Sequence, residues 1–256
     1  MEAQTKNTTL SSDNDNNIVL EIQHLQKSFG KNCVLKDISL KLAKGENLVV
    51  LGKSGSGKSV LIKCIVGLIE PDEGTLLVLG NNIDELENKS LNELRKKIGF
   101  LFQSGALYDS MTVRENLEFP LRGDSKLTQD ELDTLVKEVL ENVGLSEAID
   151  KMPSELSGGM RKRVGLARTL ILKPDIILYD EPSTGLDPIT SKEISKLIKD
   201  IQKKYNTSSI IITHDIDCTK TTADRIIVLR DGVCAAEGTF DEIQNSEDPW
   251  IQSFLK

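Results

Sequence analysis

A glycine-rich segment between a predicted strand and a predicted helix constrains the fold of this chain more than any other feature. The residues before it, 46–51, form a short apolar run typical of a buried strand, and residues 58–69 after it carry apolar side chains at helical spacing. The segment fits the pattern G-x-x-x-x-G-K-[ST] and reads Gly52-Lys53-Ser54-Gly55-Ser56-Gly57-Lys58-Ser59. A strand, this pattern and a helix together predict an α/β fold with a site for nucleotide phosphates.

Each residue type in the segment suits a phosphate. Glycines let consecutive backbone N–H groups turn towards the β-phosphate, and the N-terminus of the helix adds a positive dipole. Lys58 is expected to reach the β- and γ-phosphates, and the Ser59 hydroxyl to bind Mg²⁺. We therefore predict that residues 52–60, as far as Val60, bind the nucleotide. The alternative is a glycine-rich helix start without a ligand.

A second predicted strand ends in two carboxylates. Residues 176–179 are apolar or aromatic, and Asp180 and Glu181 follow them directly. Charged residues at the carboxyl end of such a strand usually face the ligand crevice of an open α/β sheet. We expect Asp180 to hold Mg²⁺ through water, and Glu181 to activate or orient the attacking water. The alternative is a solvated Asp-Glu turn.

The remaining pattern predicts a mainly parallel core sheet, an antiparallel β subdomain and an inserted α-helical subdomain. Capping signals are Ser90 with Glu93, Thr112 with Glu115, and Thr128 with Glu131. The predicted strands are residues 18–29 and 34–42 in a hairpin, 75–79, 98–102, 175–180, 208–213, and 225–230 with 233–236 in a second hairpin. The predicted helices cover much of 113–173 and 188–205, with short ones from Thr239 and Pro249.

Composition and charge restrict the partners. The 256 residues include 32 Lys and Arg against 40 Asp and Glu, a formal net charge of −8, so nucleic acid is not an expected partner. No apolar run approaches the ~18–20 residues of a membrane-spanning helix. Residues 1–17 are polar and predict a disordered tail rather than a signal peptide. The four cysteines lack Cys-x-x-Cys spacing, which favours buried, reduced thiols.

Further motifs resemble those of ATP-binding cassette (ABC) ATPases. Residues 156–160, Leu-Ser-Gly-Gly-Met, resemble the family's signature sequence, although Met160 stands where Gln is usual. The other matches, in chain order, are the adenine-stacking aromatic (Phe29), the Q-loop (Gln103), the D-loop (183–187) and the switch histidine (His214). The resemblance extends over about residues 18–238, and the motifs occur in the family's order.

The resemblance implies a P-loop NTPase fold with an ABC ATPase domain at 18–240, a helical subdomain at about 104–173 and a short helical end at 241–256. It also implies a Mg-dependent ATPase coupled to transmembrane transport, with ATP and Mg²⁺ as cofactors. Gln103 would contact Mg²⁺, and His214 would lie beside the γ-phosphate. A core position is the alternative for Phe29, and His24 is expected to be structural.

The signature predicts a second anion site that needs another copy of the chain. Ser157 and the N–H groups of Gly158 and Gly159 lie at a helix start, where small residues permit close approach. The family resemblance implies a head-to-tail dimer, in which each γ-phosphate lies between one P-loop and the partner's signature, with Asp187 in the D-loop. Because both copies are acidic, dimerisation is expected to depend on ATP.

Two local segments narrow the resemblance. Residues 103–116 and 156–163 look like the ATPases of Mla-type, MCE-domain lipid-transport systems of the bacterial envelope. This implies a membrane permease and an MCE-domain lipid-binding protein as partners, and a peripheral place on the cytoplasmic face of the inner membrane. The alternatives are an amino-acid, metal or lipoprotein transporter and a non-transport ABC ATPase. The basic run 161–163 is expected to be a solvated helix face.

Overall fold

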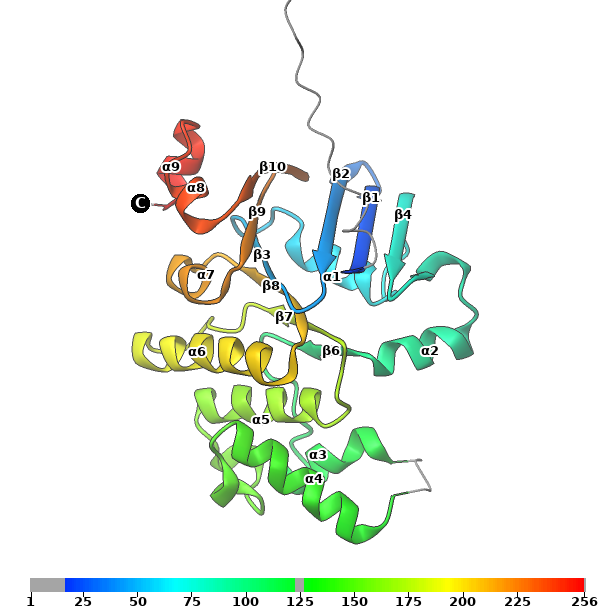
Figure 1. Cartoon of the computed structure of the whole chain (residues 1–256), viewed down its shortest axis with the longest axis vertical. Coiled ribbons are helices and arrows are strands. Elements are labelled where there is room, and N and C mark those ends of the chain that lie inside the picture. Colours follow the sequence, from blue (N-terminus) through cyan, green and yellow to red (C-terminus); the bar gives the residue numbers. More distant parts are fainter. Residues whose placement is uncertain (1–16, 123–126, 256) are drawn as a thin grey trace, which may run out of the picture.

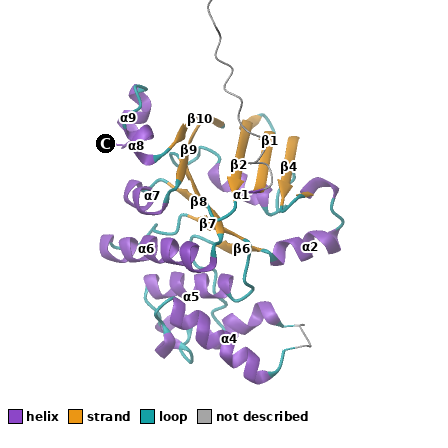
Figure 2. Ribbon diagram, in the orientation of Figure 1, coloured by secondary structure: helices purple, strands orange, loops and turns teal. Residues whose placement is uncertain are grey.

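One curved, mixed sheet runs through the protein, with helices on both sides of its parallel part (Figures 1 and 2). The computed structural model describes residues 17–122 and 127–255, so the predicted tail lies outside the described residues except for Asn17. In this described part the strand order is β5 (Asn81–Asn82), β4 (Glu73–Val78), β1 (Ile18–Phe29), β2 (Asn32–Ala43), β10 (Val233–Gly238), β9 (Arg225–Arg230), β3 (Asn47–Leu51), β8 (Ser208–Thr213), β7 (Ile176–Asp180) and β6 (Ile98–Leu101).

The strands β9, β3, β8, β7 and β6 are all parallel. Every residue of β3 and β8 is buried, which explains their continuous apolar runs, since a parallel sheet is covered on both faces. Side chains alternate between the faces. Val49 and Leu51 pack into one apolar core, and Leu48 and Val50 pack into the other.

The first half of the sheet is antiparallel. β1 pairs with β2, which confirms the predicted hairpin of residues 18–29 and 34–42. On its other side β1 pairs with β4. Gly30 has a φ of +61°, which glycine adopts without steric cost. A single parallel pairing, Val233 with Asp37, joins this region to β10 and so to the parallel core. The predicted combination of antiparallel and mainly parallel β-structure is therefore confirmed.

The helices follow most of the predicted signals. Both capping boxes at Thr112 and Thr128 are confirmed, but α2 begins two residues before Ser90, so the predicted start there is wrong. The α-helices are α1 (Lys58–Ile65), α2 (Asn88–Lys96), α3 (Val113–Glu118), α4 (Gln129–Asn142), α5 (Gly158–Leu170), α6 (Pro188–Tyr205), α7 (Ile216–Thr222), α8 (Phe240–Gln244) and α9 (Pro249–Leu255). Short 3₁₀ helices are η2 (Ile83–Glu85), η3 (Phe119–Leu121), η4 (Ser146–Ala148) and η5 (Pro153–Glu155).

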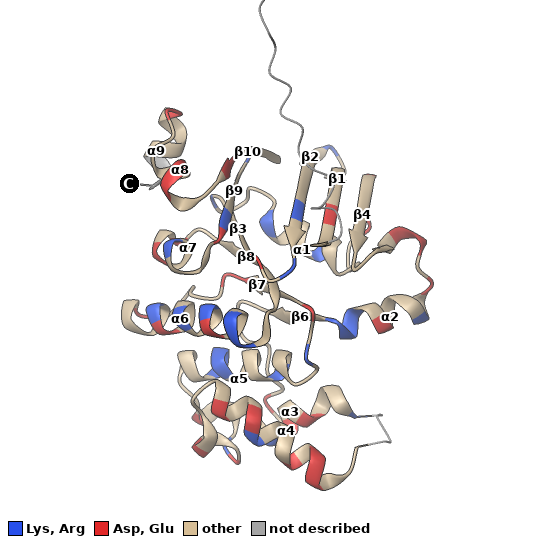
Figure 3. Ribbon diagram, viewed as in Figure 1, with Lys and Arg blue, Asp and Glu red and all other residues tan. Residues whose placement is uncertain are grey.

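The inserted helices form a separate lobe on one side of the sheet. Helix α5 packs against β6, and α3 and α4 pack on α5, on its side away from the sheet (Figure 1). The charged residues of α4 are mainly acidic, whereas those of α6 are mainly basic (Figure 3). Part of the net negative charge of the chain is therefore carried by this lobe.

Two other predictions concern burial. Cys64 and Cys218 are buried free thiols, but Cys33 is exposed and Cys234 is half-buried, so the prediction of buried thiols is wrong for Cys33. Cys33 lies next to the turn of the first hairpin, where its strand leaves the cover of the core. None of the helices in 17–122 and 127–255 is both long and apolar enough to span a bilayer.

Candidate active site

The glycine-rich segment forms one wall of a cavity of about 400 Å³ beyond the carboxyl end of β3. The backbone turns sharply there, with φ of +82° at Gly55 and +103° at Gly57. A Cβ at Gly57 would lie 2.7 Å from Leu35 Cδ2, so the close packing of the loop on β2 also requires glycine. The residues that line the cavity are Val34, Ser54, Gly55, Gly57, Lys58, Ser59, Val60, Gln103, Glu181, Thr184 and His214.

Lys58 lies inside the loop that precedes it. Its Nζ donates hydrogen bonds to the carbonyls of Gly52 at 2.7 Å and Lys53 at 3.0 Å. The same atom is 3.7 Å from Glu181 Oε1. Burial lowers the pKa of Lys58, and the Glu181 carboxylate opposes this shift. The loop thus holds a buried cation at the wall of the cavity, where an anion would be stabilised.

The Glu181 carboxylate is held by several side chains at once. Its Oε2 accepts a hydrogen bond from Thr184 Oγ1 at 3.0 Å and lies 2.8 Å from His214 Nδ1. Thr213 Oγ1 approaches the same oxygen at 3.5 Å. Glu181 has a φ of +51°, a left-handed conformation that a non-glycine residue adopts only when its surroundings enforce it. These contacts leave Oε1 as the carboxylate oxygen nearest to Lys58.

Oxygen ligands of the kind that Mg²⁺ prefers lie in the same region. Ser59 Oγ is 3.5 Å from Asp180 Oδ1, and Gln103, in the loop after β6, lines the cavity. Burial raises the pKa of Asp180, and the neighbouring Glu181 adds to the increase. A half-buried pair of neighbouring carboxylates is stabilised by a divalent cation, so the residues present fit Mg²⁺.

The signature and D-loop residues lie together on another surface. Ser157 caps α5 through a hydrogen bond from Met160 N to its Oγ at 3.3 Å, and Asp187 caps α6. The two helix starts pack closely, because a Cβ at Gly159 would lie 2.5 Å from Thr190 Cγ2. Ser157, Gly158 and Asp187 are exposed and none of them lines the cavity. The structure therefore separates them from Lys58, Gln103, Glu181 and His214, which it brings together.

Phe29 lies at the end of β1 with 48% of its surface exposed, so the alternative of a core position is wrong. Its ring does not line the cavity, and Lys27 Nζ lies 5.6 Å from the ring centroid. His24 is exposed, and its Nδ1 lies within hydrogen-bond distance, 3.0 Å, of Asp37 Oδ1.

The prediction that residues 161–163 form a solvated helix face is wrong. Only Arg161 is exposed. Lys162 is buried, and Arg163 bonds Glu193 Oε2 at 2.6 Å and the Val143 carbonyl at 3.2 Å. Helix α5 lies between the sheet and the outer helices, so successive residues on it meet different neighbours and cannot all face solvent.

Two residues, Thr184 and Lys162, contribute to the candidate site although the sequence pattern did not predict it. Thr184 donates to Glu181 and lines the cavity; its place in the D-loop motif marked the segment but gave no reason to link it to Glu181. Lys162 Nζ donates to three carbonyls of the chain just after β7. Its burial depends on how α5 packs, so no local pattern would have shown it.

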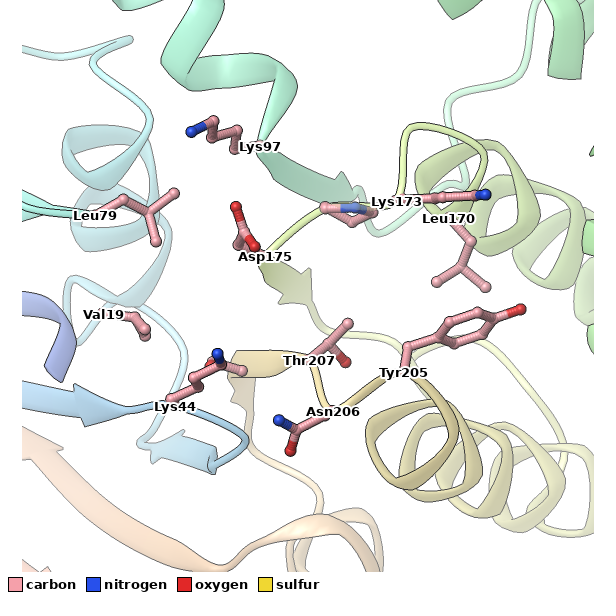
Figure 4. A pocket seen from close by; sticks show the side chains of 12 residues that line it. Val19, Lys44, Leu79, Lys97, Leu170, Lys173, Asp175, Tyr205, Asn206 and Thr207 are labelled. Carbon is pink, nitrogen blue, oxygen red and sulfur yellow. The ribbon is translucent and has the colours of Figure 1, made fainter. Parts of the chain in front are cut away.

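A second cavity, of about 460 Å³, lies at the opposite edge of the parallel strands (Figure 4). Its lining includes Asp175 and Ser208, at the starts of β7 and β8, together with Lys44 and Lys97. None of the predicted site residues is among the residues that line it. This second cavity therefore takes no part in the predicted chemistry.

Comparison with known proteins shows which family the chain resembles. Residues 35–184 match the family model described as ABC transporter. The chain is 41% identical over 238 residues to the probable ribonucleotide transport ATP-binding protein mkl of Mycobacterium leprae, covering 93% of this chain and 69% of that protein. It is 39% identical over 241 residues to the intermembrane phospholipid transport system ATP-binding protein MlaF of Haemophilus influenzae, covering 94% and 91%.

Other relatives carry different names. The methionine import ATP-binding protein MetN of Brucella abortus is 38% identical over 239 residues, covering 93% of this chain and 64% of that protein. Among solved structures, a dimeric ATP-binding cassette in a post-hydrolysis state with ADP and phosphate superposes with a TM-score of 0.78. It is 31% identical, and the match covers 86% of this chain and 98% of that one.

The chain therefore belongs to the ABC transporter family of ATP-binding proteins. It is an ATP-hydrolysing enzyme of that family, whose cofactors are ATP and Mg²⁺. The predicted α/β fold of an ABC ATPase is confirmed.

Proposed function

We propose that ATP is hydrolysed in the cavity at the carboxyl end of β3 by Lys58, Gln103, Glu181 and His214. The observation that carries this proposal is that these four side chains, from four separate segments, line one cavity. Lys58 stabilises charge on the β- and γ-phosphates, and His214 lies against the γ-phosphate. Glu181 accepts a proton from the attacking water or orients that water.

Residues 52–60 bind the phosphates through their backbone, and Phe29 stacks on the adenine ring. The exposure of Phe29 supports this role, because 48% of its surface remains accessible to a ligand. Ser59, Asp180 and Gln103 hold Mg²⁺, which would neutralise charge on the phosphates when bound. The short separation of Ser59 and Asp180 supports that assignment.

We further propose that two copies assemble head to tail, with Ser157, Gly158 and Gly159 of one copy facing the nucleotide of the other. The signature lies on an open surface beside Asp187 and the exposed side chain of Ile189, 74% of which is accessible. The solved relative is dimeric, which supports the assembly of two copies.

The proposed cargo is phospholipid, moved across the bacterial envelope with a permease and an MCE-domain protein. Among mkl, MlaF and MetN, MlaF is matched over the largest share of its own length, 91%. In this assembly the chain would sit peripherally on the cytoplasmic face of the inner membrane and reach the bilayer through the permease. Transport of methionine or another amino acid is the second candidate, because MetN is 38% identical.

Purification of the chain with its membrane subunits tests the cargo. We expect an MCE-domain protein to copurify and the assembly to transfer labelled phospholipid between vesicles when Mg-ATP is supplied. The same assembly with Glu181→Gln is the matched control, which should assemble but not sustain transfer. Recovery of a permease without an MCE-domain partner, with ATP turnover stimulated by an amino acid instead of lipid, would favour the second candidate.

A further inference from the structure

Lys162 joins the helix that carries the signature to the turn that carries Glu181. It lies one turn into α5, and only 5% of its surface is exposed. Its Nζ donates hydrogen bonds to the carbonyls of Glu181 at 3.2 Å, Pro182 at 2.7 Å and Thr184 at 2.7 Å. One ammonium group thus spans the whole turn after β7.

The three carbonyls that accept from Lys162 belong to a turn whose backbone is strained at Glu181. Glu181 has a φ of +51°, and such a conformation persists only where the surrounding structure enforces it. A second member of the turn, Thr184, donates to the Glu181 carboxylate at 3.0 Å. Loss of the ammonium would leave three carbonyls without this partner and would free the turn to relax.

The electrostatics also favour a dedicated role. A buried ammonium is costly unless its donors are satisfied, and here three carbonyl oxygens satisfy it. Burial lowers the pKa of Lys162 to about 8, an effect that the Glu181 carboxylate opposes. A neutral, well-packed side chain would avoid this cost, so stability alone does not account for the lysine.

We propose that Lys162 is a positioning residue for ATP hydrolysis, holding the turn 181–184 so that the Glu181 carboxylate faces the cavity. This inference rests on the proposed role of Glu181. Because the same helix begins with Ser157 and Gly158, contact of the signature with a partner's nucleotide is transmitted through Lys162 to the Glu181 of its own chain. Lys162 therefore connects the two half-sites of one copy.

The test compares two variants. Lys162→Met removes every hydrogen-bond donor of the side chain, whereas Lys162→Arg keeps a cation with several donors. Exposed Lys196 on α6 provides the matched control as Lys196→Met. We expect Lys162→Met to lower kcat about 10–100-fold, as expected for lost hydrogen bonds to a charged group. KM, ATP affinity and the stoichiometry of bound ATP should stay within about twofold, and Lys162→Arg should recover most of kcat.

Further variants separate the outcomes. If Lys162→Met does not fold, Lys162→Gln, which has fewer donors than lysine, takes its place and should have a kcat below that of Lys162→Arg. Wild-type kcat in every folded Lys162 variant would overturn the inference, and so would a loss of ATP-binding stoichiometry that accounts for the whole loss of turnover.

A double variant tests whether Lys162 acts through Glu181. In a Glu181→Gln background, Lys162→Met should lower the residual turnover by less than about twofold. An undiminished effect there would overturn the inference. If Glu181→Gln alone leaves turnover intact, the proposed role of Glu181 fails, which is a result distinct from failure at Lys162.

Discussion

The cavity beyond β3 and the signature surface at the starts of α5 and α6 provide different halves of a phosphate site. In the cavity, Lys58 Nζ lies 3.7 Å from Glu181 Oε1, and His214 Nδ1 lies 2.8 Å from Oε2 of the same carboxylate. The signature surface offers exposed small residues and helix caps at Ser157 and Asp187. The cavity therefore supplies the charged and reactive groups, whereas the signature surface leaves room for the close approach of a partner.

The largest expected effect separates chemistry from binding inside the cavity. Glu181→Gln should lower ATP turnover about 100–10,000-fold, because a general base contributes that much to a proton-transfer step. ATP affinity should change little, and an ATP-bound dimer should accumulate. Phosphate release, nucleotide titration and light scattering measure these three quantities. Glu147→Gln, on the exposed surface of the helical lobe, is the control, and equal turnover in both variants would remove Glu181 from its role.

The next effect should appear only when two copies meet. Gly158→Asp places a carboxylate on the open signature surface, where an added Cβ meets only ordinary contact with Leu186 Cδ2 at 3.5 Å. Turnover and ATP-dependent dimerisation should fall more than about 100-fold, because opposed like charges cost several kcal/mol. ATP binding to the monomer should be retained, as nucleotide titration at low protein concentration would show.

Gly158→Ala controls for size in that experiment, since it adds a Cβ without charge. It should dimerise far better than Gly158→Asp. If Gly158→Asp instead weakens ATP binding to the monomer, the signature surface is not separate from the cavity.

A smaller effect is expected for the cavity lysine. Lys58→Ala removes the ammonium that now bonds the Gly52 and Lys53 carbonyls. ATP affinity should fall about 10–100-fold, the amount expected for hydrogen bonds to a charged group. Isothermal titration with Mg-ATP measures it, and Lys196→Ala, at an exposed position of α6 outside residues 52–60, is the control. Unaltered affinity in Lys58→Ala would place the phosphates elsewhere.

The smallest effect concerns the base. Phe29→Ala should weaken ATP binding about 10-fold, since aromatic stacking on a base contributes about 1–3 kcal/mol. Phe29→Trp should restore it. Thermal stability should change little because the ring is half-exposed. A large fall in melting temperature with unchanged ATP affinity would show that Phe29 supports the fold instead.

Local patterns predicted the elements that carry most of the site. The boundaries of α6 and both capping boxes agree with the structure, because capping side chains bond their own backbone and need no distant partner. The start of α2 was misplaced, since Glu87 precedes it without a side-chain cap. The exposure of Cys33 was also not predictable from local sequence, because it depends on where its strand leaves the core.

Residue types and their near-neighbour spacing were enough to indicate which side chains can bind phosphate and Mg²⁺. Which of these side chains share a cavity depends on the tertiary structure. Lys58, Gln103, Glu181 and His214 meet because parallel strands end at one edge of the sheet. Lys162 was predicted to lie on a solvated helix face, but it is buried, because α5 packs against residues far away in the chain.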